Sequence, residues 1–200
     1  MRNDEGRRLK AGGQRGTLWL LGCLALLIPI LAIRIDAATT ADAQSTSYAS
    51  IPIASWRLNG DGHAVLKVGN TVYVGGSFTR ATSPSGDRSA NRYNLAAFDA
   101  STGALISSFR ADTDGRVHDL LTDGTSLFVS GSFSTVNGAA HKRLAVLDLN
   151  SGAVRSGFRA DASGTVYSMS LAAGKLYVSG AFTSINGTAR TRAAAVSPTT

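Results

Sequence analysis

Val74-Gly75-Gly76-Ser77-Phe78-Thr79 is the stretch that decides the fold, because the chain contains it three times. The later copies are Val129 to Ser134 and Val178 to Thr183, and their phenylalanines follow the first at intervals of 55 and 49 residues. Self-similarity at a period of this size indicates a stacked repeat architecture. A long extra loop at 81–91 accounts for the wider first interval. The sequence therefore predicts a repeat fold.

Short apolar runs surround each copy. In the second unit they are 117–121, 127–129 and 144–148, and a fourth run ends at 158–161. Runs of about four to seven β-branched or aromatic residues, broken by Gly, Asn, Asp or Ser, indicate short antiparallel strands. No stretch after residue 44 has the apolar period of a helix. The predicted fold is all-β, with four-stranded antiparallel blades of propeller type.

About three blades are expected. Units that each begin at an aligned glycine (Gly62, Gly115 or Gly164) cover 62–114, 115–163 and 164–200. Residues 55–61 are then interpreted as an orphan fourth strand, which would complete the last blade if the ends met and would remove free sheet edges. Because propellers usually have about four to eight blades, three alternatives remain open. Two chains form a six-bladed ring, the chain is a fragment of a longer array, or the sheets stack openly.

The first 43 residues have the pattern of an export segment. Five Lys and Arg residues precede an uncharged, mostly apolar stretch from Thr17 to Ile33, and small residues follow at 41–43. This order is typical of a signal peptide over 1–43. An uncleaved anchor helix stays open as an alternative, because 17 residues reach the short end of the transmembrane range. Either alternative predicts a secreted or extracytoplasmic protein, anchored to a membrane only if 17–33 is retained.

Residues 44–54 are expected to be a linker and 55–200 the domain. Cys23, the only cysteine, lies in the apolar stretch, so the domain has no disulfide framework. Residues 44–200 contain 14 Lys and Arg against 9 Asp, a net charge of about +5. This surplus permits binding to anionic surfaces and also favours solubility. Nucleic acid is not an expected partner, because the aromatic and basic residues do not interleave.

The repeat has the pattern V-[GS]-G-[SA]-F-[TS], followed by LAAFD or LAVLD, a glycine turn and F-R-A-D. With this pattern the chain resembles the delta-60 repeat β-propellers of secreted bacterial proteins. The resemblance covers 55–200. It implies an exported propeller domain, and because that family is largely without assigned chemistry it implies no catalytic residue. The chain departs from the family in its low number of units. It also carries Ser197 where Asp99 and Asp148 stand in the earlier units.

A basic loop precedes the third run of each unit and is the predicted binding surface. The candidate ligand-binding residues in these loops are Arg92, Lys142, Arg143, Arg190 and Arg192. We expect the loops to share a face with the aspartate-rich turns. Two outcomes are open: the arginines pair with these aspartates, or they form an anion site, since a guanidinium binds carboxylate, phosphate or sulfate.

His118 and Asp119 are the only catalytic candidates, because they form a polar pair that the repeat does not require. Aligned on the unit glycines, their counterparts are Tyr167 and Ser168 in one unit and Val65 and Leu66 in another. No second carboxylate or nucleophile accompanies them, so catalysis is not favoured.

Asp112 and Asp114 precede Gly115 as oxygen ligands do at the start of a calcium loop, but the later Glu is missing. Asp and Gly are also good turn formers, so turn chemistry is the preferred interpretation and no metal is predicted. Gly76, Gly131 and Gly180 lie inside a strand, which indicates a bulge or a close backbone approach that lets the following phenylalanine pack between units.

The expected function is a non-catalytic extracellular binding or scaffold module without a cofactor. Its expected partners are an anionic cell-wall polymer or a protein, and a second copy that completes a six-bladed ring. One alternative is a carbohydrate-active or other hydrolytic propeller enzyme. The other is a truncated fragment of a longer propeller without independent function.

Overall fold

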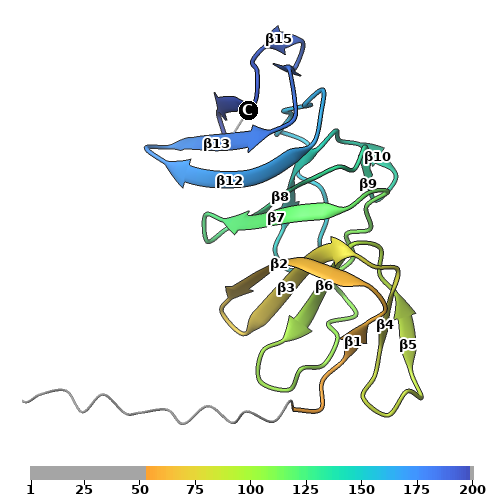
Figure 1. Cartoon of the computed structure of the whole chain (residues 1–200). Helices are drawn as coiled ribbons and strands as arrows, with labels where there is room; N and C mark the ends of the chain where they lie inside the picture. Colours follow the sequence, from red (N-terminus) through yellow and green to blue (C-terminus); the bar gives the residue numbers. More distant parts are fainter. Residues whose placement is uncertain (1–52, 199–200) are drawn as a thin grey trace, which may run out of the picture. The chain divides into compact units, whose positions relative to one another are not determined.

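The computed structural model describes residues 53–198, and every regular element in this range is a β-strand (Figure 1). Three antiparallel three-stranded sheets have the same strand order, with the second strand in the middle. Their strands are β2 (Asp61–Val68), β3 (Thr71–Ser77) and β6 (Leu95–Asp99); β7 (Val117–Thr122), β8 (Ser126–Gly131) and β11 (Leu144–Asp148); β12 (Val166–Ala172), β13 (Lys175–Gly180) and β16 (Ala193–Val196). The predicted all-β class is confirmed.

A hairpin interrupts the connection from the second to the third strand of every sheet. The hairpin strands are β4 (Arg80–Thr82) and β5 (Ser89–Asn91), β9 (Thr135–Val136) and β10 (Ala139–Ala140), and β14 (Ser184–Ile185) and β15 (Thr188–Ala189). The first hairpin is the longest, which agrees with the predicted insertion at 81–91. Below, the first, second and third units are residues 55–107, 109–156 and 158–198.

The middle strands are apolar on both faces because both faces are covered. All six residues of β8 are buried, and the pleat sends Leu127 and Val129 to one side and Phe128 to the other. Leu127 and Val129 face the first unit, while Phe128 faces the third. A strand buried on both faces has a continuous apolar run instead of an alternating one.

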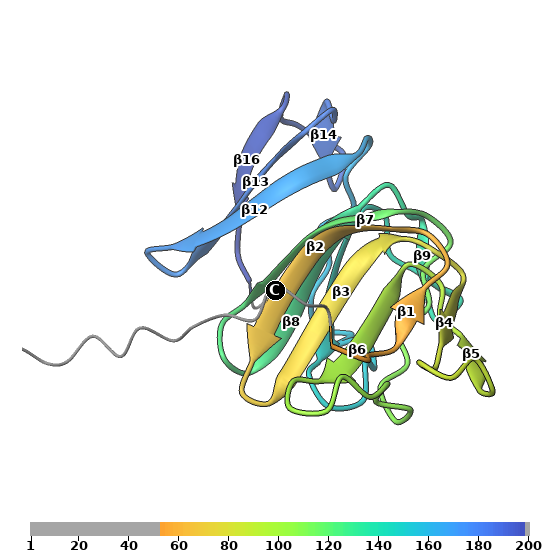
Figure 2. The same ribbon diagram turned by 60° about the horizontal axis from the view of Figure 1, so that its bottom comes forward.

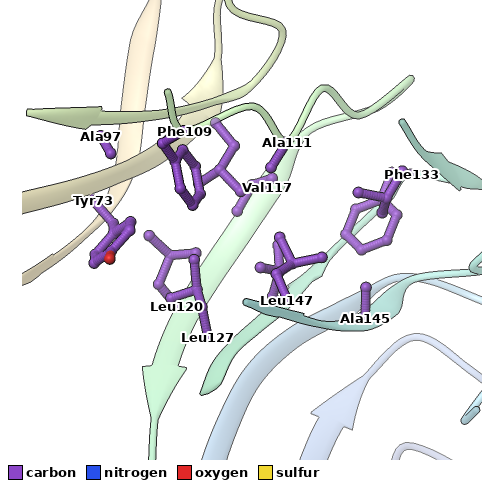
Figure 3. Packing of buried hydrophobic residues seen from close by; sticks show 13 residues of the cluster. Tyr73, Ala97, Phe109, Ala111, Val117, Leu120, Leu127, Phe133, Ala145 and Leu147 are labelled. Carbon is purple, nitrogen blue, oxygen red and sulfur yellow. The ribbon is translucent and has the colours of Figure 1, made fainter. Parts of the chain in front are cut away.

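The core between the first and second units is shown in Figure 3. Tyr73 and Leu95 of the first sheet pack there against Val117 and Leu120 of the second. The Tyr73 ring meets the Phe109 ring edge-on, with 5.2 Å between centroids. The Tyr73 hydroxyl donates a hydrogen bond to the Leu149 carbonyl at 2.6 Å. The second and third units pack in the same way, with Phe128 against Phe158 at 6.4 Å.

The glycine alignment predicted for the first unit is wrong by two residues. The Asn59 side-chain oxygen accepts hydrogen bonds from the N–H groups of Thr79 and Arg80. Asp114 and Ser163 do the same for the hairpin entrance of their own units. Gly60, which follows Asn59, is therefore equivalent to Gly115 and Gly164. The run Asn59-Gly60-Asp61-Gly62 offers two similar glycines, and the sequence alone favoured the second.

Residues 55–61, predicted as an orphan fourth strand, contain β1 (Arg57–Leu58), which pairs with β4 of its own unit. Trp56 and Leu58 pack with Phe98 of the first sheet. The predicted fourth strands are reduced to single bridges, Phe98 with Leu105 and Leu147 with Val154. Among residues 53–198 no strand pairing joins the first sheet to the third, so these residues do not form a closed ring.

The strand glycines mark a close backbone approach, as predicted. A Cβ on Gly131 would lie 2.0 Å from the carbonyl oxygen of Arg116, and Gly76 and Gly180 have the same relation to Asp61 and Thr165. The close contact is with the first strand of the same sheet.

The predicted export or anchor segment over 1–43, with its apolar stretch 17–33, lies outside the described residues, as does most of the linker 44–54. Within 53–198, no helix is long and apolar enough to cross a membrane.

Candidate functional site

The first strands of the three sheets, β2, β7 and β12, follow one another across the units, with β7 between the other two (Figures 1 and 2). Each strand is bulged at the same place, where the register shifts around His63, His118 and Tyr167. The His63 and His118 rings lie 5.9 Å apart, and the His118 and Tyr167 rings 5.3 Å apart. These three residues, here called the aromatic stripe, are the candidate functional site.

The bulge explains why the stripe faces outward. A bulged residue has no partner opposite it, so its side chain is freed from the alternation of the strand. Tyr167 is 53% exposed, and His63 is also exposed, whereas His118 between them is half-buried. The next residues inward, Val117 and Val166, are fully buried. The stripe thus consists of surface rings that follow a buried valine in the second and third units.

The pKa of His118 is lowered from its ordinary value near 6.5. The main cause is burial, and the positive charge of Arg116 and the neighbouring His63 lower the pKa further. At neutral pH the central ring of the stripe is therefore an uncharged imidazole. It can stack on a ligand and donate or accept a hydrogen bond.

Asp119, predicted beside His118 as a catalytic candidate, binds the backbone. One carboxylate oxygen accepts the N–H of Leu120 at 2.9 Å, and the other accepts the N–H of Met169 in the third unit at 2.7 Å. The second of these hydrogen bonds connects the second unit to the third, and the first lies within β7. His118 lies instead against His63 and Tyr167.

Arg92 was predicted as a surface ligand, but it is only 1% exposed. Its guanidinium donates to the carbonyls of Asn91 at 2.8 Å and Ser107 at 3.3 Å, while its Nε has no hydrogen-bond partner. Burial lowers the pKa of Arg92, the charge of Arg110 lowers it further, and Asp112 opposes both. Arg92 is a structural cation that a polymer cannot reach.

The other predicted loop cations differ in exposure. Arg143 is half-buried, and its Nη1 donates to the Phe133 carbonyl at 2.7 Å and to the Ser134 hydroxyl at 2.8 Å. Lys142, Arg190 and Arg192 are exposed. These three are the predicted ligand-binding residues whose side chains are open to a large ligand.

The loop cations and the stripe lie at the same end of the sheets. The Gly131 N–H donates to the Arg143 carbonyl, and the Ser132 N–H donates to the Arg116 carbonyl just before β7. The loop 132–143 and the bulged start of β7 are therefore adjacent. We call this the loop end, and it consists of the aromatic stripe with the exposed cations Arg116, Lys142, Arg190 and Arg192.

The aspartate turns share this end, as expected, but they do not pair with the loop cations. The ion pairs found within 53–198 are Arg110 with Asp112, Arg159 with Asp161 and Arg155 with Asp148. Asp112 also accepts the Tyr93 N–H, and Asp114 accepts the N–H groups of Ser134 and Thr135. Both carboxylates thus bind backbone N–H groups about 20 residues away, and the turn interpretation of Asp112 and Asp114 stays a prediction. In the described range no three His, Cys, Asp or Glu residues gather as metal ligands would.

His63 was missed from the sequence. With Gly62 aligned in place of Gly60, the counterpart of His118 in the first unit was Val65, and the stripe could not be recognised. The signal was present: His63 and His118 each lie three residues after the unit glycine at 60 and 115, and Tyr167 lies three residues after Gly164.

No protein-family model matches this chain, and no curated protein matches it. Function is therefore inferred from the chemistry of the loop end.

Proposed function

We propose that the chain is a non-catalytic extracytoplasmic binding module of the delta-60 propeller type, and that its loop end binds an anionic, sugar-containing wall polymer. The observation that carries this proposal is the aromatic stripe with exposed cations beside it. Its three rings come from three successive units and extend along the surface, as an elongated ligand requires.

The chemistry of the loop end suits such a polymer. Aromatic rings pack on the apolar faces of sugar rings, and the edges of Tyr and neutral His offer hydrogen-bonding groups to hydroxyls. Arg116 and Lys142 supply exposed positive charge, which attracts phosphate, carboxylate or sulfate groups. A repeating polymer would contact equivalent positions of successive units.

Two further observations support the proposal. Three sheets of one strand order with adjacent first strands support the proposal, since stacked sheets of this kind resemble propeller blades without the fourth strand. Each oxygen of the Asp119 carboxylate accepts a backbone N–H, and His118 lies against His63 and Tyr167, so we explain the two residues as part of the stripe and as a link between units. Extracytoplasmic placement rests on the pattern of residues 1–43.

The test is retention of the full chain on immobilised dextran sulfate, with uncharged dextran as reference. Arg116→Gln with Lys142→Gln removes two charges from the loop end. Lys67→Gln with Lys175→Gln removes two exposed charges from the opposite hairpin ends and is the matched control. We expect the first variant to elute at clearly lower salt than the control, and Tyr167→Ala to weaken retention at constant charge. Equal loss in both charge variants, with no effect of Tyr167→Ala, would show attraction by net charge alone and overturn the proposal.

A further inference from the structure

Two sheet faces of the described residues are open, one on the first unit and one on the third. The open face of the third sheet, here called the front face, consists of Tyr177, Ser179, Ala193 and Ala195, and it lines a hollow of about 420 Å³. The open face of the first sheet, the back face, consists of Trp56, Leu58, Val65, Val72 and Val74, and most of it lines a hollow of about 400 Å³.

The front face is one half of an interface that the chain already forms twice. In the strand registers, Tyr73 lies opposite Ala97, Phe128 opposite Val146, and Tyr177 opposite Ala195. Tyr73 and Phe128 are 3% and 1% exposed because the following unit covers them, whereas Tyr177 is 44% exposed. Tyr177 therefore occupies an interface position, and nothing in 53–198 covers it.

The back face is the other half. Val65 lies opposite Val74 in the same register as Leu120 opposite Val129 and Met169 opposite Val178. Leu120 and Met169 are 7% and 8% exposed because the preceding unit covers them, but Val65 is 72% exposed. Val65 is not a single exposed residue but part of an apolar face with the partly buried Trp56, Leu58, Val72 and Val74, and a contiguous apolar face of this kind marks an interaction surface.

We infer that the front face of the third sheet binds the back face of the first sheet of a second copy of this chain. The contact repeats the arrangement of the two interfaces inside the chain, so its geometry is already realised twice. It joins unlike faces and is therefore head-to-tail: it closes into a ring if the rotation allows and extends into a filament if it does not. Closure after two copies would give the six-unit ring expected from the sequence.

One residue at the rim of this contact differs from its counterparts in the internal interfaces. In the internal interfaces Asp112 accepts the Tyr93 N–H at 3.2 Å, and Asp161 accepts the Lys142 N–H at 3.0 Å. The equivalent position of the first unit is Arg57, since Arg57 lies opposite Thr82 as Asp112 and Asp161 lie beside Asn137 and Asn186. A second copy thus brings Arg57 to Thr191, next to the exposed Arg190.

The contact is therefore apolar at its centre and has two like charges at its rim. Salt screens like charges, so association should become stronger as the salt concentration rises. Replacing Arg57 by Asp removes the repulsion and supplies the carboxylate that the internal interfaces use. Arg57→Asp should strengthen association about tenfold, which corresponds to about 1.4 kcal/mol.

The test is sedimentation of the full chain in mild detergent over a range of protein and salt concentrations. We expect reversible association that Arg57→Asp strengthens. Tyr177→Lys or Val65→Lys should abolish it, while Tyr93→Lys, on an exposed tyrosine outside both faces, should not. The decisive sample mixes the Tyr177→Lys and Val65→Lys variants. Each is monomeric alone, but together they retain one intact front face and one intact back face, so they should form one-to-one dimers that grow no further.

Two results would overturn the inference. One is a wild-type chain and an Arg57→Asp variant that both stay monomeric at all concentrations. The other is a mixture of the two lysine variants that stays monomeric although each variant is folded by circular dichroism. Neither result bears on polymer binding, because the loop-end residues are unchanged.

Discussion

The carboxylate of Asp119 accepts a hydrogen bond from the backbone N–H of Met169, 50 residues further along the chain, at 2.7 Å. The same carboxylate accepts the N–H of Leu120, so one side chain connects the first strands of the second and third units. The core of the interface between the two units is apolar, and these hydrogen bonds fix the position of β7 relative to β12.

Replacing Asp119 by Ala should lower the free energy of unfolding by about 1–3 kcal/mol, because it leaves partly buried N–H groups without an acceptor. Asp119→Asn keeps one acceptor oxygen and should lose less. Urea unfolding followed by circular dichroism measures both. Asp61→Ala, at an exposed carboxylate of β2, is the control and should change stability by less than about 0.5 kcal/mol. Equal losses in both alanine variants would contradict an inter-unit role for Asp119.

Arg92 and Arg190 occupy equivalent positions, since their N–H groups donate to the carbonyls of Thr79 and Thr183 in their own hairpins. Arg92 is buried and binds two carbonyls, whereas Arg190 is exposed. Arg92→Ala should therefore destabilise the fold by about 2–4 kcal/mol, through lost packing of the side-chain stem and unpaired carbonyls. Arg190→Ala should stay within about 0.5 kcal/mol. Thermal unfolding of the two variants side by side decides between a structural and a surface role for Arg92.

The same pair shows what the sequence could and could not predict. The apolar runs and turn residues of each unit are local signals, and they predicted the three strands of each sheet and the insertion at 81–91. They did not predict the hairpin strands, and the fourth strand that they predicted is reduced to a single bridge. Whether a loop cation is buried depends on the chain that follows its sheet. Arg92 is buried and donates to the Ser107 carbonyl near Arg110 and Asp112, whereas Arg190 is exposed. Information of that kind lies in the stacking of units and not in the loop sequence.

The aromatic stripe was hidden for a different reason. Its recognition required the correct alignment of the first unit, and Asn59-Gly60-Asp61-Gly62 fits the glycine pattern in two ways. The structure chooses between them through the hydrogen bonds of Asn59 to Thr79 and Arg80. Asn59 binds residues that lie 20 and 21 positions further along the chain, and the glycine pattern alone does not predict these hydrogen bonds.

Gly131 should tolerate no side chain. An alanine Cβ there would lie 2.0 Å from the Arg116 carbonyl oxygen, and both backbones belong to one sheet and cannot separate freely. Gly131→Ala should destabilise the fold by about 1–3 kcal/mol, as overpacking does. Gly157→Ala is the control, because a Cβ at Gly157 meets nothing within 4 Å. The urea midpoints of the two variants should differ in this direction, and equal midpoints would argue against the close approach.

The turn after the first sheet contains Asp99, which should make the free energy of unfolding depend on pH in the acidic range. Hydrogen bonds from the Ser101 hydroxyl and from Thr102 lower the pKa of Asp99 to about 2. A carboxyl whose pKa is lower in the folded state contributes stability above its unfolded pKa near 4, and loses it as the pH falls through about 2. Asp99→Asn should be less stable than wild type at pH 7, and the difference should shrink between pH 4 and pH 2. Thermal midpoints measured across this range test the prediction; a constant difference would contradict it.

The ionisation of His118 reports on the stripe directly. Burial, Arg116 and His63 lower the pKa of His118, so its nuclear magnetic resonance titration should have a midpoint below 6.5. The neutral form of a histidine with a lowered pKa stabilises the fold above the unfolded pKa, and this contribution is lost as the pH falls through the folded value. Arg116→Gln removes a nearby positive charge and should raise the midpoint of His118, whereas Lys67→Gln, at the far end of β2, should leave it unchanged. A midpoint that does not move in Arg116→Gln would mean that Arg116 does not act on the stripe. Arg116 would then no longer count among the residues of the loop end.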